Sequence, residues 1–138
     1  MECRIMYLPL LDDEHKKLFL ELAFHMVMAD GVFCDEEREM MNCYYAEMKC
    51  EPLNEKEIRE INVVIQDMKI KMGEREKKIV VFEMLGLALS DDDYAVQEQE
   101  IIEKLIGNFG ISQEFPDECQ SLINEYLSIQ KRLNKLIL

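Results

Sequence analysis

Two acidic segments hold the side chains of this sequence that are best suited to binding a metal ion. The first contains Asp30 and, seven residues later, Glu37; the second contains Asp91, its neighbour Asp92, and Glu98, which again follows Asp91 by seven. Carboxylate oxygens are the ligands that Ca²⁺ and Mg²⁺ prefer in proteins. Neither segment is an EF-hand loop, because its twelfth position is apolar. The sequence therefore predicts a weak divalent-cation site, for Ca²⁺ or Mg²⁺, formed by these carboxylates.

Local helix chemistry explains these carboxylates only in part. The helix dipole favours acidic residues near a helix start by about 0.3–1 kcal/mol each. A capping box would explain Glu37 and Glu98 more fully, but it needs Ser or Thr three residues earlier, where the chain has Cys34 and Ala95. If both turns lie at one end of the molecule, repulsion raises the carboxyl pKa values, and a divalent cation relieves it. The alternative is a solvent-exposed acidic cluster that tolerates the repulsion without a metal.

The sequence has no recognisable catalytic set. His15 and His25 are the only histidines, and Glu21 precedes His25 by four residues, whereas the Glu-x-x-His pairs of di-iron bundles need three. We expect His25 to be half-buried with one hydrogen bond, and a place beside a metal is the alternative. Phosphate-binding loops and the G-x-S-x-G motif are absent. These features favour a non-enzymatic protein, and a carboxylate-metal enzyme is a third alternative.

Apolar residues recur at steps of three and four along almost the whole chain, which indicates an all-α fold. Asp12 suits the N-cap of a first helix, which Gly31 would end. Asn54 and Glu57 have the spacing of a capping box that opens a third helix, and Gly73 would close it. The prediction is a compact bundle of six to seven helices in a single domain spanning residues 1–138. The expected helices cover about 13–29, 35–49, 55–72, 74–89, 95–109 and 116–136, with a seventh if residues 4–10 are helical.

An internal repeat connects the acidic segments to these helices. At a shift of 61 residues, MVMADGVFCDEEREMM lies over LALSDDDYAVQEQEII, so Asp30 aligns with Asp91 and Glu37 with Glu98. Apolar positions align as well, and an aromatic residue stands in the middle of both turns. Each copy thus has the pattern helix, acidic turn, helix. We expect the two helix-turn-helix copies to pack in a pseudo-two-fold arrangement that brings both turns to one end of the bundle.

These motifs resemble those of the TerB-like family, which comprises tellurite-resistance protein B and its relatives. Ala29-Asp30-Gly31 through Glu37 matches the first motif, and Ser90-Asp91 through Glu98, followed by Phe109-Gly110-Ile111-Ser112, resembles the second. The resemblance covers roughly residues 12–127, with Asp92 where the family often has glycine. It implies a cytoplasmic, all-helical and roughly pseudo-symmetric protein. It also implies an acidic surface proposed to bind divalent cations, and a role in tellurite resistance or stress response.

Composition and charge argue against several classes of ligand and location. The chain has 138 residues, 29 acidic and 16 basic side chains, and a formal net charge of −13. So acidic a protein repels a phosphate backbone, so DNA or RNA is not expected as a partner. No apolar run approaches the ~20 residues of a membrane span. The five cysteines form no C-x-x-C pair and no export signal is recognisable, which indicates a cytoplasmic protein.

The last predicted helix carries apolar residues at alternating steps of three and four, as a coiled-coil seam would. They are Cys119, Leu122, Tyr126, Ile129, Leu133 and Leu136. The favoured interpretation is that this helix closes its own domain in a monomer, and a homodimer is the alternative. The leading hypothesis for function is a TerB-like module that binds a divalent cation weakly and interacts with other proteins. The alternative is a metal-free helical protein-interaction domain.

Overall fold

The computed structural model describes residues 7–29, 35–89 and 96–138, except the side chains of residues 36 and 37. Six α-helices and two short 3-10 helices account for most of these residues, and no β-strand occurs among them. The predicted all-α bundle is confirmed, and the described part of the seventh helix considered for residues 4–10 is only a 3-10 turn. In chain order the elements are η1 (Leu8–Leu10), α1 (Asp13–Val27), α2 (Asp35–Met48), η2 (Glu55–Glu57), α3 (Ile61–Lys71), α4 (Glu74–Leu89), α5 (Val96–Phe109) and α6 (Glu114–Ile137).

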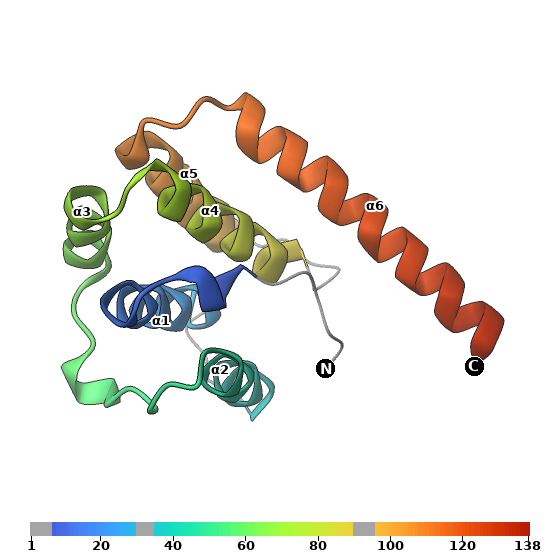
Figure 1. Ribbon diagram of the computed structural model, residues 1–138, viewed down its shortest axis with the longest axis horizontal. Coiled ribbons are helices and arrows are strands. Elements are labelled where there is room, and N and C mark those ends of the chain that lie inside the picture. The colour runs from blue at the N-terminus through green and yellow to red at the C-terminus, as the bar shows by residue number, and fades with distance from the viewer. Residues whose placement is uncertain (1–6, 30–34, 90–95) are drawn as a thin grey trace.

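Helices α1 and α4 are the innermost elements of the fold. Figure 1 shows α1 between α2 and the α4–α5 pair, with α3 beside it, and the contacts between helices agree. Both helices bury long runs of apolar side chains, such as Phe19 on α1 and Val80 on α4, each 0% exposed. The Asp12 carboxylate fixes the start of α1 by accepting a hydrogen bond from the His15 N–H at 2.8 Å. The remaining helices cover this central pair.

The two helix pairs α1–α2 and α4–α5 have matching bounds. Helices α2 and α5 each contain 14 residues, and both ends of α5 lie 61 residues after those of α2. Helix α4 begins 61 residues after α1 and is one residue longer. The shift that aligns the sequence therefore also aligns the helices on either side of the two acidic turns. A pseudo-two-fold axis between the two pairs stays a prediction.

The same shift relates the ends of α2 and α5. Lys49, directly after α2, has φ 54°, and Gly110, directly after α5, has φ 66°. In both cases the next N–H donates to the carbonyl five residues earlier, at 3.0 Å after α2 and 3.2 Å after α5. This is the left-handed Schellman cap, for which glycine is the preferred residue. Lysine adopts it after α2 at a conformational cost that glycine avoids after α5.

The third helix begins later than the sequence predicts. Asn54 caps only the 3-10 turn η2, because its side chain accepts from a backbone N–H two residues on, at 3.1 Å. The chain is extended at Ile58 and at Glu60, and α3 begins at Ile61 with the Glu60 carboxylate at its N-cap. The predicted helix start at Asn54 is wrong because Arg59 is bonded to α1 through its backbone and side chain, as described below.

Candidate functional site

The carboxylates predicted to bind a cation lie mostly outside the described residues. Asp30, Asp91 and Asp92 belong to the segments 30–34 and 90–95, and of Glu37 only the backbone, in the first turn of α2, is described. Glu98 is half-buried in the first turn of α5. Among the side chains that the structure describes, no group of three or more His, Cys, Asp or Glu could hold a metal ion. The cation site therefore stays a prediction.

His25 has a structural contact near the end of α1. Its Nε2 lies 2.7 Å from the carbonyl oxygen of Arg59. A carbonyl oxygen can only accept, so Nε2 carries the proton and donates this bond. The half-buried, hydrogen-bonded His25 expected from the sequence is confirmed. Its contact joins α1 to the segment in front of α3.

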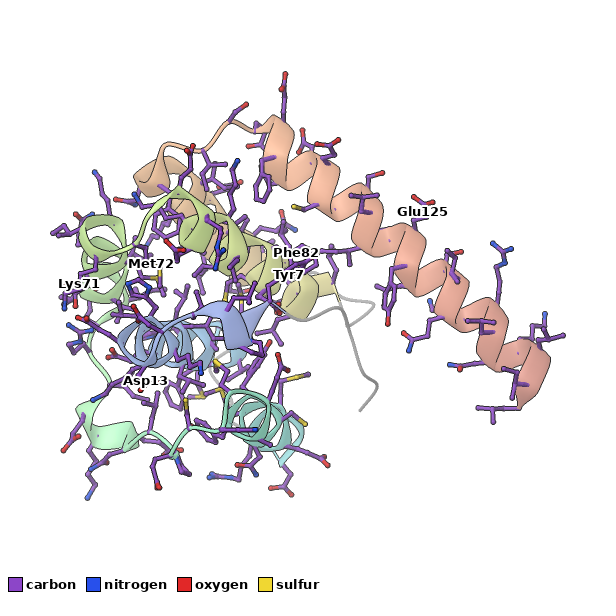
Figure 2. All side chains as sticks on the ribbon, in the orientation of Figure 1. Tyr7, Asp13, Lys71, Met72, Phe82 and Glu125 are labelled. Atoms are coloured by element: carbon purple, nitrogen blue, oxygen red, sulfur yellow. The ribbon has the colours of Figure 1, made fainter. Side chains whose placement is uncertain are left out.

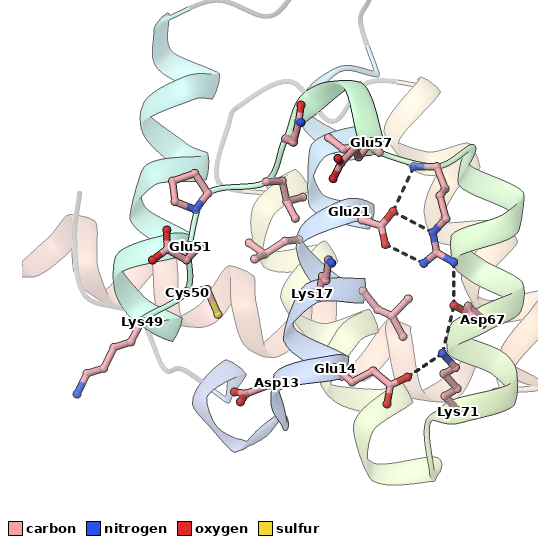
Figure 3. Close-up of a pocket in the computed structure, with 17 residues that line it drawn as sticks. Asp13, Glu14, Lys17, Glu21, Lys49, Cys50, Glu51, Glu57, Asp67 and Lys71 are labelled. Carbon is pink, nitrogen blue, oxygen red and sulfur yellow. Dashed lines mark hydrogen bonds and ion pairs between the residues drawn. The ribbon is translucent and has the colours of Figure 1, made fainter.

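A polar groove of about 810 Å³ runs along α1, between the segment 49–59 and α3 (Figure 3). Apolar residues such as Leu18, Leu20 and Leu53 form part of its lining. Ten of the 17 lining residues are charged, and they include both acidic and basic side chains. The charged lining residues are Asp13, Glu14, Lys17, Glu21, Lys49, Glu51, Glu57, Arg59, Asp67 and Lys71.

Glu21 is a buried carboxylate in this groove, with 5% of its surface exposed. Arg59 reaches it from the extended segment before α3. The Arg59 Nη2 donates to Glu21 Oε1 at 2.8 Å, while Nε and the backbone N–H each donate to Oε2 at 3.2 Å. Both carboxylate oxygens are hydrogen-bonded, as a buried charge requires. Because His25 binds the Arg59 carbonyl, the backbone of Arg59 is held on α1 at its N–H and at its C=O.

The ion pairs continue from Arg59 along α3 and back to α1. Arg59 Nη1 is 2.9 Å from Asp67 Oδ2, and Lys71 Nζ lies 3.6 Å from the same oxygen and 2.7 Å from Glu14 Oε1. Figure 3 shows this alternation of charges across the space between the two helices. The hydrogen bond from Arg59 lowers the pKa of Asp67, and the bond to Glu14 raises the pKa of Lys71. Each of these groups is therefore stabilised in its charged form.

This network holds α3 and the segment before it against α1. Sequence reasoning missed the pair because Glu21 and Arg59 are 38 residues apart. The one signal was an acidic residue at position 21, on the same face of α1 as Leu18 and His25.

Helix α6 has two parts with different surroundings. Its first part packs on α4, where Cys119 and Ile123 are each only 8% exposed. For this first part of α6, the interpretation that the helix closes the core of its own domain is confirmed. It then continues past the rest of the bundle (Figure 1), and every residue from 131 to 138 is exposed. The last seven residues of this 24-residue helix, 131–137, therefore pack on no core of their own.

One side of α6 presents an apolar stripe to solvent, which we call the α6 seam. It consists of Leu122, Ile129, Leu133 and Leu136, whose exposed fractions are 60%, 46%, 49% and 82%. These residues follow the steps of seven, four and three that place side chains on one face of a helix. The seam is part of the coiled-coil pattern predicted from the sequence. Its residues are exposed, whereas Cys119 at the start of the pattern is buried.

Charge changes sign along α6. Figure 2 shows Glu125 on the side of the helix that is turned away from α4. Acidic residues occupy the first part, and basic residues follow after Glu125 in a chain that is otherwise strongly acidic. The charged residues of α6 are Glu114, Asp117, Glu118 and Glu125, then Lys131, Arg132 and Lys135.

Comparison with protein-family models, with curated proteins and with solved structures finds no match to this chain. The resemblance to the TerB-like family therefore depends on the short motifs in the sequence. Among the helices in the described ranges, none combines the length and the apolar character needed to cross a lipid bilayer.

Proposed function

We propose that this chain is a non-enzymatic helical module that acts by binding protein through the α6 seam. The observation that carries the proposal is the row of four large apolar side chains from Leu122 to Leu136, each 46–82% exposed. Contiguous exposed apolar surface on a helix is typical of a protein–protein contact, whereas single exposed leucines are common. The charged groove supports a non-enzymatic role, because its ion pairs hold α3 and the segment before it against α1.

A capture experiment with matched variants tests this function. Tagged wild-type protein is compared with a variant carrying Leu133→Glu and Leu136→Glu, and with Ile70→Glu as the control. Ile70 is a 78%-exposed apolar residue on α3, away from the seam. The bait is offered a cell extract and, separately, an untagged copy of this chain. We expect the wild type and the control to retain a common set of proteins, which the seam variant loses. Equal retention by all three would contradict the proposal.

The resemblance to TerB-like proteins supports a further proposal, that the acidic turns bind a divalent cation in a cytoplasmic stress or tellurite-resistance response. The matching helix bounds favour it, because the shift of 61 that superposes Asp30 on Asp91 also superposes the flanking helices. Two equivalent connections would then carry carboxylates at equivalent places. The alternative is the same interaction module without a metal.

Thermal unfolding in Ca²⁺, Mg²⁺ and Mn²⁺ separates these two forms of the module. A cation that binds only the folded state raises the melting temperature, by an amount that grows with its concentration. We expect this rise in the wild type and its loss in Asp30→Asn with Asp91→Asn. Glu100→Gln with Glu103→Gln is the control, because it removes two exposed charges of α5 outside the turns. If the melting temperature of the wild type does not change at millimolar cation, the cation site is wrong and the alternative, the same module without a metal, is favoured.

A further inference from the structure

We propose that the partner on the α6 seam is a second copy of this chain, whose α6 lies antiparallel to the first. This inference rests on the proposed function and names the partner for it. A two-fold axis would pass beside α6 between residues 127 and 128, so that the same surface is used on both subunits. Two observations support this arrangement, the spacing of the seam and the charges along α6, and the apolar area indicates that the association is weak.

The apolar spacing of α6 allows an antiparallel register in which Leu122, Tyr126, Ile129 and Leu133 pair across the two-fold axis. In antiparallel coiled coils, the residues at the two apolar heptad positions face each other in alternating layers. With the axis between residues 127 and 128, Leu122 faces Leu133 of the partner subunit, and Tyr126 faces Ile129 of the partner subunit. The two-fold axis repeats each contact. Leu122 is open to such a contact because 60% of its surface is exposed, although it lies where α6 packs on α4.

Charge favours the same register. Glu125 and Arg132 lie on the same flank of the seam, seven residues apart. In the antiparallel register, Glu125 lies near Arg132 of the partner subunit, and the two-fold axis repeats this pair. A parallel pairing would instead place the acidic first parts side by side and the basic ends side by side. The charges on the two α6 helices therefore attract each other in an antiparallel pair and repel each other in a parallel pair.

The apolar area of the seam is that of a weak homodimer. The four exposed side chains of the seam, at about 60–120 Å² each when fully exposed, offer roughly 150–300 Å² per subunit. A dimer would bury up to twice that area, which is less than the apolar share of a standard interface of ~1,200–2,000 Å². We therefore expect weak association that depends on concentration.

The charge pattern of α6 itself favours a second copy over a lipid surface. The exposed end of α6 is amphipathic and basic, which by itself would suit an anionic membrane. The rest of α6 is acidic up to Glu125, so an anionic leaflet would attract one end of the helix and repel the other. In the antiparallel pair both parts of the helix lie beside opposite charge, which acts against the repulsion between two chains of −13 each.

Molar mass in solution tests the dimer directly. Light scattering or sedimentation of the pure wild type, from micromolar to millimolar concentration, should rise from 16.3 kDa towards twice that value. Leu133→Glu should hold the mass at one chain throughout the range, while Ile70→Glu, the exposed apolar control on α3, should associate as the wild type does. Leu133 lies beyond the part of α6 that packs on α4, and circular dichroism should show an unchanged helix content in both variants.

Mixing two charge variants tests the antiparallel register. In Glu125→Arg alone, two arginines face each other across the interface, and in Arg132→Glu alone two glutamates do. The dimer of each variant should therefore dissociate at a protein concentration several-fold higher than that at which the wild-type dimer dissociates. An equimolar mixture should recover the wild-type mass, because a mixed dimer restores both attractive pairs. Weakening of each variant alone, together with recovery of the wild-type mass on mixing, distinguishes this register from a parallel pairing, in which the wild type already has like charges opposite each other.

Each contrary outcome has a definite meaning. A wild type that stays at the mass of one chain up to millimolar concentration overturns the dimer. If seam-dependent capture of other proteins persists in that case, the proposed function stands with a different partner. If the monomer instead co-sediments with anionic vesicles and Leu133→Glu does not, the seam binds lipid, and both proposals are wrong. Dimers whose charge variants do not recover on mixing refute the antiparallel register.

Discussion

Replacing Arg59 by methionine should destabilise the fold strongly, although Arg59 lies at the surface. The variant keeps an unbranched apolar side chain and removes the guanidinium that donates to both oxygens of Glu21. Glu21 is 5% exposed, so its carboxylate would remain buried without its cation. Removing one partner of a buried ion pair costs about 3–5 kcal/mol.

Two features of the structure reduce this cost. The Arg59 side chain is 41% exposed, so water can reach the space that the guanidinium leaves. The Arg59 backbone N–H also continues to donate to Glu21 Oε2. We therefore expect Arg59→Met to lower the free energy of unfolding by about 2–3 kcal/mol, below the full value for a buried pair. Because the same side chain holds the segment before α3, unfolding of α3 should become easier than unfolding of α4.

Urea unfolding followed by circular dichroism measures the effect. Arg75→Met is the matched control: Arg75 is 67% exposed and lies 3.5 Å from Glu76, so its loss should change stability by less than about 0.5 kcal/mol. Glu21→Met combined with Arg59→Met should recover most of the loss, because no unpaired charge is left buried. An Arg59→Met protein within about 0.5 kcal/mol of the wild type would refute this account of the pair.

Two further predictions concern pH and the helix caps. Asp67→Asn should lower the melting temperature at neutral pH, because the pKa of Asp67 is lowered in the folded protein and its carboxylate therefore stabilises the fold. This stability is lost when the carboxylate is protonated, so the difference between variant and wild type should disappear as the pH falls below about 4. A difference that persists at pH 2 would exclude the ion pairs of Asp67 as its source. Lys49→Gly should raise the free energy of unfolding by roughly 0.5–1 kcal/mol and Gly110→Ala should lower it by about 1 kcal/mol, because both positions have positive φ. Urea unfolding measures both changes. If Lys49→Gly destabilised the protein and Gly110→Ala stabilised it, the two caps would not share this conformation in solution.

Periodicity predicts most of the helices here because their apolar faces lie against one core. The bounds of α2 and α5 follow from apolar positions such as Met41 and Ile102, which align in the repeat and are both buried. The start of α3 does not follow from the sequence, because a local capping signal at Asn54 competes with a tertiary contact at Arg59. That contact depends on Glu21, 38 residues earlier, and no local spacing encodes it.

The α6 seam shows the same division between pattern and environment. Its heptad spacing is visible in the sequence, and the spacing alone is equally consistent with a core helix and with an interface. The structure separates the two uses along one helix: Cys119 and Ile123 belong to the core, whereas Leu133 and Leu136 extend past it. Because α6 packs on α4, the length of α4 decides where the core-packed part of α6 ends and its exposed part begins.

The different surroundings of α3 and α6 support the proposal of a partner for α6. Each follows one of the matching helix pairs and packs on the first helix of that pair, α3 on α1 and α6 on α4. Helix α3 also contacts α5, through a bond of 2.7 Å between Gln66 Nε2 and Asn108 Oδ1, and it is joined to α1 by the ion pair of Lys71 with Glu14. Within the described parts of the chain, α6 makes its main contacts with α4 alone. It is also more than twice as long as α3 and keeps its apolar pattern to the end. A second α6 would give it the neighbour on its other side that α5 gives to α3.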